Sequence, residues 1–487
     1  MKSYKKIIFL FAAVLAGMIL FMSSSAYAQA TTWQRLYDNH NSSDYGADIC
    51  NADSGNSFVV GFSLQSGPDG FNAYVLKLNQ QGDTIWARMF GNFTATQVYT
   101  CASSGDGGCV ISGDRDSAFA IKINGNGDLV WQKYYGDRYV IIYDIIKTSD
   151  GGYIACGRIQ RSNLGEGYVY KIDSLGNLQW KKIFTSGYAK FFYSIVQEND
   201  KFIVAGLEIK NEISETICFL VKLNLNGDSM WEKMYSVFPD FASSFLRIDF
   251  SRNKYNIAGS AFDFVKGYTR TFVMRIDTSG NVLDTIIMHY YAHEYLKDFK
   301  VTENNRYIIT STIDTLKGTY SRVYITDSTG NIISQKLFIL GEFGILKSIL
   351  IVPNSSDFMF AGLCRMKFSL TRDYYVIRTD STLFAKPVGI SNNNSSVISN
   401  AYTLNQNYPN PFNNSTKIEY SVAKKSDILF RVTDVLGRII LTRDFSNINS
   451  GIHSFIFDAT NLSSGIYYYT FFLNGNIAES KTMILIK

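Results

Sequence analysis

The chain has 487 residues, which is too long for one small domain and suggests about three domains. Hydrophobic residues make up 46% and charged residues 18%, so the chain can bury a large core and is not disordered. Aromatic residues make up 15%, which favours strands over helices. The net charge of +5 falls to +2 if Lys2, Lys5 and Lys6 leave with a removable leader, and so small a charge argues against nucleic acid as a partner.

Residues 1–28 have the order of a secretory signal peptide. Three lysines precede an apolar run at 7–21, and the small residues Ala26 and Ala28 follow, ahead of Gln29. The apolar run is short for a bilayer span, which takes about 20 residues, so a retained anchor is the weaker interpretation. We predict cleavage after Ala28 and no transmembrane helix in the remaining chain.

A unit of about 50 residues recurs through residues 29–386. Each unit has an apolar run that ends in a small residue such as Gly157, then an alternating run, then a tight turn and a last run that often carries Trp. The repeated turn positions are Gly82, Trp86, Gly127, Trp131, Gly176, Trp180, Gly227, Trp231, Gly280 and Gly330. Four short antiparallel strands per unit predict the blades of a β-propeller.

The two ends of the repeat region predict that the ring closes. The seventh unit lacks its last strand, and residues 32–37 supply such a strand ahead of the first complete unit. Completing the last blade with the first strand removes the exposed edges that an open array would leave. We therefore predict an all-β fold with a seven-bladed propeller over residues 29–386. Six or eight blades are alternatives, and so is an open solenoid.

The turn motif also carries a family resemblance. Asp173, Gly176 and Trp180 follow the spacing Asp-x-x-Gly-x-x-x-Trp, which resembles the Asp-box of sialidase-like propellers. The order of Gly-Gly, Tyr and Trp is similar to kelch repeats, and the units resemble the repeats of large secreted bacterial proteins of unassigned activity. The resemblance implies a propeller and names no activity.

One basic position recurs just before the turn. It is occupied by Lys77, Lys122, Lys171, Lys222, Arg275 and Arg378 in six units and by Ile325 in the other. A nearly complete basic ring could bind an anion. A position repeated in every blade is more simply explained by a need of each blade, and we expect these side chains to pair with carboxylates of the turns.

The tail changes character after the repeats. A polar run at 391–396 predicts a linker over 387–401. Four motifs follow in order, and their residues are Tyr408, Pro409, Asn410, Pro411 and Phe412, then Asp434 and Gly437, then Gly465 and Tyr467, then Lys481 to Lys487. Together they resemble the C-terminal sorting domain of the Bacteroidetes-type type IX secretion system over residues 402–487. Short strands between Gly, Asn and Ser turns also predict a small immunoglobulin-like β-sandwich.

The sorting resemblance implies a partner and a destination. Such domains are recognised by the type IX secretion machinery at the outer membrane after passage through the periplasm. We therefore expect a protein that is extracellular or on the cell surface of a Gram-negative bacterium. The tail of such cargo is often removed, and the sequence leaves open whether this one is.

The sequence contains no recognisable catalytic constellation. It has no Gly-x-Ser-x-Gly, no His-Glu-x-x-His and no phosphate-binding loop, so we assign no catalytic, cofactor-binding or metal-ligating residue. Cys101 and Cys109 flank a turn and could face each other across a hairpin, although buried thiols are the preferred interpretation.

Our functional hypothesis is a non-catalytic binding or adhesion module for an unknown extracellular glycan or protein. The alternative is an extracellular polysaccharide hydrolase or lyase. In either case we expect the ligand to contact the loops that differ most between units, at 65–71, 160–167, 207–217 and 261–271.

Overall fold

The computed structural model describes residues 32–385 and 402–487, apart from short gaps at 40–41, 65–70, 91–96, 116, 137–138, 162–163, 211–215, 238–240, 264–266, 292–293, 316–317, 340, 367–368, 370, 423, 436–437 and 474–475. The predicted leader with Ala26, Ala28 and Gln29, the predicted linker at 387–401, and Gly437 lie outside the described residues. Across the described part the protein is all-β, and the one helical turn there is η1 (Asp53–Gly55).

Five sheets of four strands follow one another along the chain, and in each sheet strands adjacent in sequence pair with each other. The first two sheets consist of β2 (Ser43–Asn51), β3 (Ser57–Leu64), β4 (Phe71–Leu78) and β5 (Thr84–Phe90), and of β6 (Gln97–Ser103), β7 (Cys109–Arg115), β8 (Ser117–Ile123) and β9 (Leu129–Tyr134). The next two consist of β10 (Val140–Lys147), β11 (Tyr153–Arg161), β12 (Leu164–Ile172) and β13 (Leu178–Phe184), and of β14 (Ala189–Glu198), β15 (Lys201–Ile209), β16 (Thr216–Leu223) and β17 (Ser229–Tyr235). The fifth consists of β18 (Phe241–Ser251), β19 (Lys254–Asp263), β20 (Tyr268–Asp277) and β21 (Val282–Tyr291).

An eight-stranded sheet completes the repeat region, and it is made of two runs of four strands. The first run consists of β22 (Glu294–Val301), β23 (Tyr307–Thr315), β24 (Gly318–Thr326) and β25 (Ile332–Phe338). The second consists of β26 (Phe343–Ile351), β27 (Phe358–Arg365), β28 (Asp373–Thr379) and, from the start of the chain, β1 (Trp33–Tyr37). The pairing between the two runs is confined to Thr319 and Phe343. β1 pairs antiparallel with β28, with Trp33 opposite Arg378.

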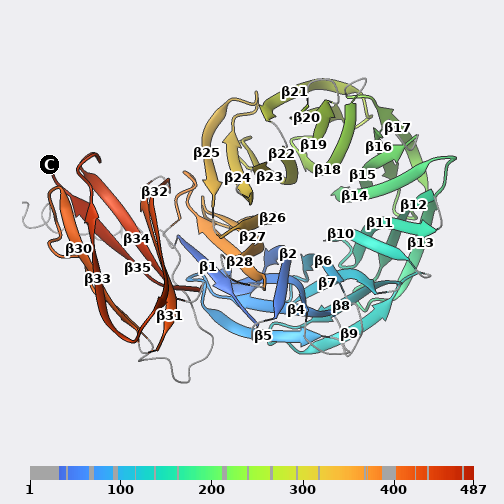
Figure 1. The fold of residues 1–487 in the computed structure, drawn as a ribbon. Helices are drawn as coiled ribbons and strands as arrows, with labels where there is room; N and C mark the ends of the chain where they lie inside the picture. The colour runs from blue at the N-terminus through green and yellow to red at the C-terminus, as the bar shows by residue number, and fades with distance from the viewer. Residues whose placement is uncertain are drawn as a thin grey trace, which may run out of the picture.

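The sheets stand around a central space, as Figure 1 shows, with the first strand of each run innermost. Consecutive sheets share apolar cores, because alternate side chains of each strand point to opposite faces. Phe58 and Val75 of the first sheet, for example, pack in one cluster with Ile111 and Phe119 of the second. This propeller-like arrangement buries both faces of each sheet.

The same kind of core joins the two ends of the repeat region. Val59 and Leu76 of the first sheet share a cluster with Met359 and Val376 of the last run and with Trp33 of β1. The first and last sheets are therefore packed as the other neighbours are.

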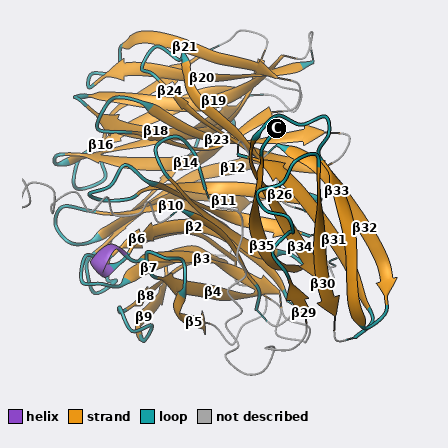
Figure 2. Ribbon diagram, turned by 90° about the vertical axis from the view of Figure 1, so that its left-hand side faces the viewer, coloured by secondary structure: helices purple, strands orange, loops and turns teal. Residues whose placement is uncertain are grey.

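The tail forms two further sheets beside the ring. One sheet has the order β29 (Tyr402–Leu404), β30 (Ser415–Val422), β33 (Gly451–Asp458), and the other has the order β32 (Ile439–Ile448), β31 (Ser426–Asp434), β34 (Gly465–Leu473), β35 (Asn476–Leu485). They share a core that includes Phe430, Phe455 and Phe471. Figure 2 shows the tail strands alongside the ring, and Leu429 and Phe472 join an apolar cluster of the last sheet of the ring.

The cysteines are all buried and free in the structure. Cys101 lies opposite Ile111, and Cys109 lies opposite Ser103, so the two cysteines are not directly paired across their hairpin. Cys50 of the neighbouring sheet contacts the thiols of both. In the part of the chain that is described, no helix is long and apolar enough to cross a membrane.

Candidate functional site

The repeated turn glycines each lie against the preceding sheet. Their left-handed φ angles are near +80°, a region that strongly favours glycine. A Cβ at Gly82 or Gly227 would come within 2.7 or 2.8 Å of the ring of Trp33 or Trp180. Gly127 and Gly176 lie in the same way against Trp86 and Trp131 of the sheets before them. Glycine is therefore required at these turns both by conformation and by the close aromatic ring.

The same tryptophans hydrogen bond to the neighbouring turn. Trp86 Nε1 donates to the Gly125 carbonyl at 3.0 Å, and Trp180 Nε1 donates to the Leu225 carbonyl at 2.8 Å. Trp33 of β1 donates to the Gln80 carbonyl at 2.9 Å, so the first strand makes the contact that other fourth strands make. These bonds attach each outer strand to the next sheet.

Two turns depart from this pattern. Gly280 lies against the side chain of Lys233, whose Nζ donates to the Ser279 carbonyl at 2.8 Å, while the Trp231 ring lies 5.7 Å from that ammonium. Gly330 lies against Ile286, since the preceding sheet has no tryptophan at this place.

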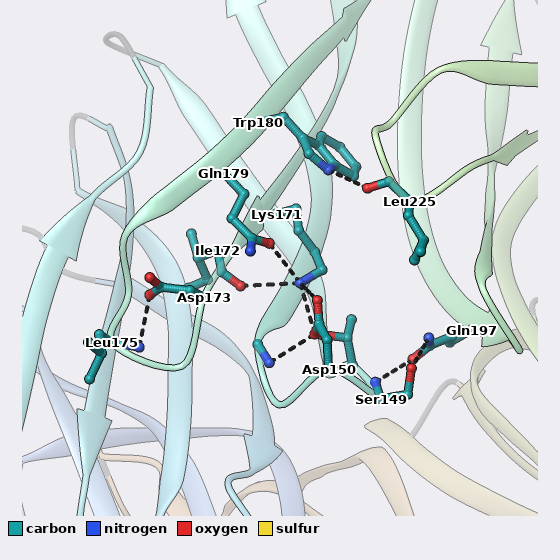
Figure 3. A network of polar contacts seen from close by, with 12 residues as sticks. Ser149, Asp150, Lys171, Ile172, Asp173, Leu175, Gln179, Trp180, Gln197 and Leu225 are labelled. Carbon is teal, nitrogen blue, oxygen red and sulfur yellow. Dashed lines mark hydrogen bonds and ion pairs between the residues drawn. The ribbon is translucent and has the colours of Figure 1, made fainter.

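The repeated basic side chains pair with hairpin carboxylates, as predicted. Five ion pairs join a strand to the hairpin between the first two strands of its own sheet, and these are Lys77–Asp53, Lys122–Asp106, Lys171–Asp150, Lys222–Glu198 and Arg378–Asp357. Arg275 differs because it pairs with Asp284 of β21. Figure 3 shows the Lys171 network, in which Nζ lies 2.8 Å from Asp150 Oδ2 and 2.9 Å from Gln179 Oε1.

These ion pairs leave the basic ring with little capacity for a ligand. Lys171 is 1% exposed. The pKa of Asp150 is lowered to about 2, because Lys171 and the Thr148 hydroxyl stabilise its charged form against the opposing effect of burial. We call the end of the ring that carries these turns and ion pairs the turn side. Its charged side chains are therefore occupied by contacts within the protein.

The inner strands carry a second repeated feature, a β-bulge. In each of the strands β2, β6, β10, β14, β18, β22 and β26 the pairing with the next strand skips one residue. The skipped residues are Ala47, Tyr99, Tyr143, Tyr193, Phe245, Lys297 and Lys347. A bulge turns a side chain away from the regular alternation of the strand. We call these seven positions the bulge layer; the side chain of Phe245 lies outside the described part.

The residue after the bulge closes the gap between neighbouring inner strands. Asp48 Oδ2 accepts from the Cys101 N–H at 2.8 Å, Asp144 Oδ2 accepts from the Ile195 N–H at 2.9 Å, and Asp298 Oδ2 accepts from the Ile349 N–H at 2.7 Å. Thr100 Oγ1 accepts from the Ile145 N–H at 3.3 Å in the same way. Inner strands are sheet edges, and these side chains satisfy N–H groups that an edge would leave unpaired.

Charged side chains among these strands balance one another. Arg247 Nε donates to Asp298 Oδ1 at 3.2 Å. Burial disfavours the Lys300 ammonium, but Asp298, Asp249 and Asp144 outweigh it and raise the pKa of Lys300 above its ordinary value. Burial also raises the pKa of Asp48 to about 6, although its hydrogen bonds oppose the change.

Three consecutive members of the bulge layer, Tyr99, Tyr143 and Tyr193, are aromatic. The rings of Tyr99 and Tyr143 lie 6.1 Å apart between centroids, and those of Tyr143 and Tyr193 lie 5.2 Å apart. Arg158 of β11 lies over the Tyr143 ring at 5.9 Å and over the Phe191 ring at 4.7 Å. All three tyrosines are half-buried, so their rings keep some surface for a ligand.

The last two members of the bulge layer are lysines. Lys297 and Lys347 follow each other on β22 and β26, and Arg372, just before β28, is the next charge that acts on Lys347. Burial, together with these two cations, lowers the pKa of Lys347 to about 8. Arg372 stacks on Tyr45 with its guanidinium carbon 5.0 Å from the ring centroid.

A cavity of about 470 Å³ lies among the inner strands. Tyr99, Tyr143 and Lys347 of the bulge layer line it, together with Asp48 and Arg247. This volume is in the range of small-molecule sites and would accept one or two sugar rings. The cavity and the bulge layer form our candidate site.

Three carboxylates form a separate cluster at the other end of β2. One oxygen from each of Asp38, Asp44 and Asp373 lies within 4.8 Å of the others, so they are the described residues that could hold a metal ion. Burial raises the pKa of Asp44 to about 7 and that of Asp373 to about 8, with repulsion from the other carboxylates adding to both shifts. A cluster of acidic side chains does not by itself identify an ion, and we assign none.

The candidate site differs from the sequence expectation. Parts of the loops at 65–71, 160–167, 207–217 and 261–271 lie outside the described residues, namely 65–70, 162–163, 211–215 and 264–266. The cavity is lined by inner strands and not by these loops. The bulge positions stand 13 to 15 residues before the repeated small residue, which lies inside the next strand, so an alignment of the units could have found them. Such an alignment could not have shown that the pairing of the two strands skips a residue at these positions.

The sorting motifs of the tail converge on its last strand. The Ile484 N–H donates to Asn410 Oδ1 at 2.8 Å, and buried Phe412 exchanges backbone hydrogen bonds with Ile484 and Ile486. Pro409 and Pro411 follow cis peptide bonds. Tyr408 projects outward and is 81% exposed.

The other motif residues secure the turns of the tail. Asp434 Oδ2 accepts from Arg438 Nε at 2.6 Å, and the Tyr467 hydroxyl donates to the Ser463 carbonyl at 2.8 Å. Lys487 reaches the Thr460 carbonyl with its ammonium. Lys481 lies in β35, and Gly465 begins β34 with open space where a Cβ would stand.

The fold and site therefore define an all-β protein with a propeller-like ring of sheets. Residues 406–487 match the family of the secretion system C-terminal sorting domain, and this tail implies export by the type IX system to the cell surface or the extracellular space. No curated protein sequence matches the chain.

Several solved structures are similar to the chain at low sequence identity. A protein of unknown function from Bacteroides caccae is 12% identical, with 58% of this chain and 95% of that chain covered and a TM-score of 0.38. The Dos1 propeller is 11% identical, with 74% and 84% covered and a TM-score of 0.43. The GH93 alpha-L-arabinofuranosidase of Fusarium graminearum, in complex with arabinobiose, is 8% identical, with 72% and 97% covered and a TM-score of 0.45.

Proposed function

We propose that the mature protein is a closed seven-bladed propeller over residues 29–386, followed by a linker at 387–401 and an immunoglobulin-like sorting domain at 402–487. The seven bulged inner strands and the pairing of β1 with β28 support the blade count and the closure. The two tail sheets around one core support the sandwich. The exposed Tyr408 side chain is a suitable contact for the secretion machinery, because the machinery could not recognise a buried side chain by direct contact.

We infer that the propeller is a non-catalytic module that binds an extracellular glycan. The observation that carries this is the row of three tyrosines in the bulge layer beside a cavity of about 470 Å³. Aromatic rings with a hydroxyl at one end offer both an apolar face for a sugar ring and a hydrogen bond to its edge. A narrow cavity favours a saccharide over the broad face of a folded protein.

The carboxylates of the site argue for binding without catalysis. Asp48, Asp144 and Asp298 each accept a backbone N–H from the next inner strand. A general acid or nucleophile has to reach the substrate, and these oxygens are turned toward the neighbouring strand instead.

A hydrolase or lyase is the second candidate function. Charged side chains do enter the cavity, and burial holds the pKa of Asp48 at about 6, which is suitable for a general acid. Asp48, Asp144 and Asp298 all line the cavity, so the pair of carboxyls for this reaction would come from these three.

The test uses the chain from Gln29 to Lys487 and a panel of soluble and insoluble polysaccharides. Retention and new reducing or unsaturated ends are measured in the same samples. We expect retention without new ends, and weaker retention of Tyr143→Ala. If the parent protein produces new reducing or unsaturated ends and the Asp48→Asn variant does not, the non-catalytic assignment is wrong and the protein is an enzyme.

A further inference from the structure

Lys347 lies in the cavity without the carboxylate that accompanies the repeated lysines at the turns. On the turn side, each repeated lysine has an acidic partner. Within the described residues, Lys347 has neither a hydrogen bond nor an ion pair. The charges that act on Lys347 after burial are those of Lys297 and Arg372, and both repel it.

The arginines beside the bulge layer have unused donors. Arg372 Nε is buried without a hydrogen-bond partner, although one of its terminal nitrogens bonds the Tyr45 hydroxyl. Arg158 Nε, on the aromatic side, is also buried without a partner, while Nη2 bonds Gln160 Oε1 at 3.1 Å. A buried donor without an acceptor is costly, and an acceptor supplied by a ligand removes the cost.

Repulsion between cations and unused donors both favour an anion at this place. An anionic group near Lys347 would pair with its ammonium and screen it from Lys297 and Arg372. The carboxylates of the inner strands do not take this role, because Asp298 and its neighbours act on Lys300 and bond the next strand. The excess positive charge therefore faces the ligand rather than the protein.

We propose that the bulge layer binds an acidic polysaccharide, with carboxylate or sulfate groups at Lys347, Lys297 and Arg372 and sugar rings on the tyrosines. This rests on the proposed glycan binding and adds the chemical class of the glycan. The tyrosines lie on β6, β10 and β14, and the lysines lie on β22 and β26, across the ring from them (Figure 1). One chain end in the cavity can contact Tyr99, Tyr143 and Lys347, because all three line it.

The test is affinity electrophoresis of the chain from Gln29 to Lys487 in gels that contain polygalacturonate, chondroitin sulfate or neutral dextran. We expect retardation by one or both acidic polymers, none by dextran, and a weaker effect as salt increases. The two acidic polymers separate carboxylate from sulfate recognition. Lys347→Gln should weaken the acidic interaction by about tenfold, the effect expected for a lost charge-assisted bond.

Lys336→Gln is the matched control. Lys336 is also half-buried with its pKa lowered to about 8, but it lies on the outer strand β25. Lys336→Gln should bind like the parent protein. Cooperative thermal unfolding at or above the midpoint of the parent protein shows that both variants are folded.

The possible outcomes separate this inference from the function on which it rests. Equal binding of neutral and acidic polymers, or an unchanged affinity of Lys347→Gln, would overturn the acidic ligand and leave glycan binding in place. Failure to bind any polysaccharide in the wider panel would overturn both.

Discussion

The turn side of the ring and the bulge layer show opposite uses of the same repeat. At the turns of the first four sheets the same glycine, an aromatic neighbour and a paired lysine recur, as with Gly176, Trp131 and Lys171. In the bulge layer the backbone repeats while the side chain changes from tyrosine to lysine around the ring. Identical contacts are what each pair of sheets needs, whereas side chains that differ at one equivalent position are free to serve a ligand.

The largest effect should come from the turn side. Lys171→Ala removes a buried cation that holds Asp150 and Gln179, and we expect the free energy of unfolding to fall by about 3 kcal/mol. This loss is at the low end of the range for breaking a buried ion pair, because the Asp150 side chain is half-exposed. Urea unfolding measures it, and a loss below about 0.5 kcal/mol would contradict the structural role of the turn side.

The next effect concerns the glycine at the turn. Gly227→Ala places a Cβ 2.8 Å from the Trp180 ring at a φ of +78°. We expect this substitution to lower the free energy of unfolding by about 1–3 kcal/mol. Gly151→Ala is the control, since its φ is +83° but its Cβ meets no atom within 4 Å. The control should lose about 1 kcal/mol from backbone strain alone. Equal losses in urea unfolding would show that the tryptophan contact has no effect.

The carboxyl cluster at the start of β2 should make stability depend on pH. The folded pKa of Asp373, about 8, lies above its unfolded value, so the folded state binds the extra proton and stability is lost as pH rises from about 4 to 8. Asp373→Asn should therefore stabilise the protein by about 1–3 kcal/mol at pH 8 and have little effect at pH 4. Thermal or urea unfolding at both pH values is the measurement. Asp200→Asn, on an exposed side chain, serves as control and should leave the pH dependence unchanged.

The smallest effect on stability should come from the bulge layer itself. Lys347→Gln removes a cation that burial and repulsion disfavour, so we expect it to raise the free energy of unfolding slightly, by about 1 kcal/mol at pH 7. Binding should respond more strongly. Because the pKa of Lys347 is about 8, its charge is present below that pH and disappears above it, so affinity for polygalacturonate should fall between pH 7 and 9. The variant should lack this step, and an identical pH profile in both proteins would show that Lys347 does not contact the anion.

The sorting tail and the repeats could be recognised from short motifs. Asn410, Phe412 and Tyr467 keep fixed places in the sequence because they bond backbone groups within one small domain. The turn glycines are equally visible, since both a left-handed φ and a nearby ring demand glycine. The pairing of Lys171 with Asp150 was also predictable from its repetition.

By itself, therefore, the sequence determined the export tail, the four-stranded units and the side chains that hold them together, because each depends on local or repeated contacts. The candidate site was decided only by the tertiary structure. Tyr143 and Lys347 stand about 200 residues apart in the chain, and they line one cavity because the ring brings their strands together and a bulge aims each side chain away from its sheet. Neither the meeting of those strands nor the skipped register leaves a motif in the sequence of a single unit.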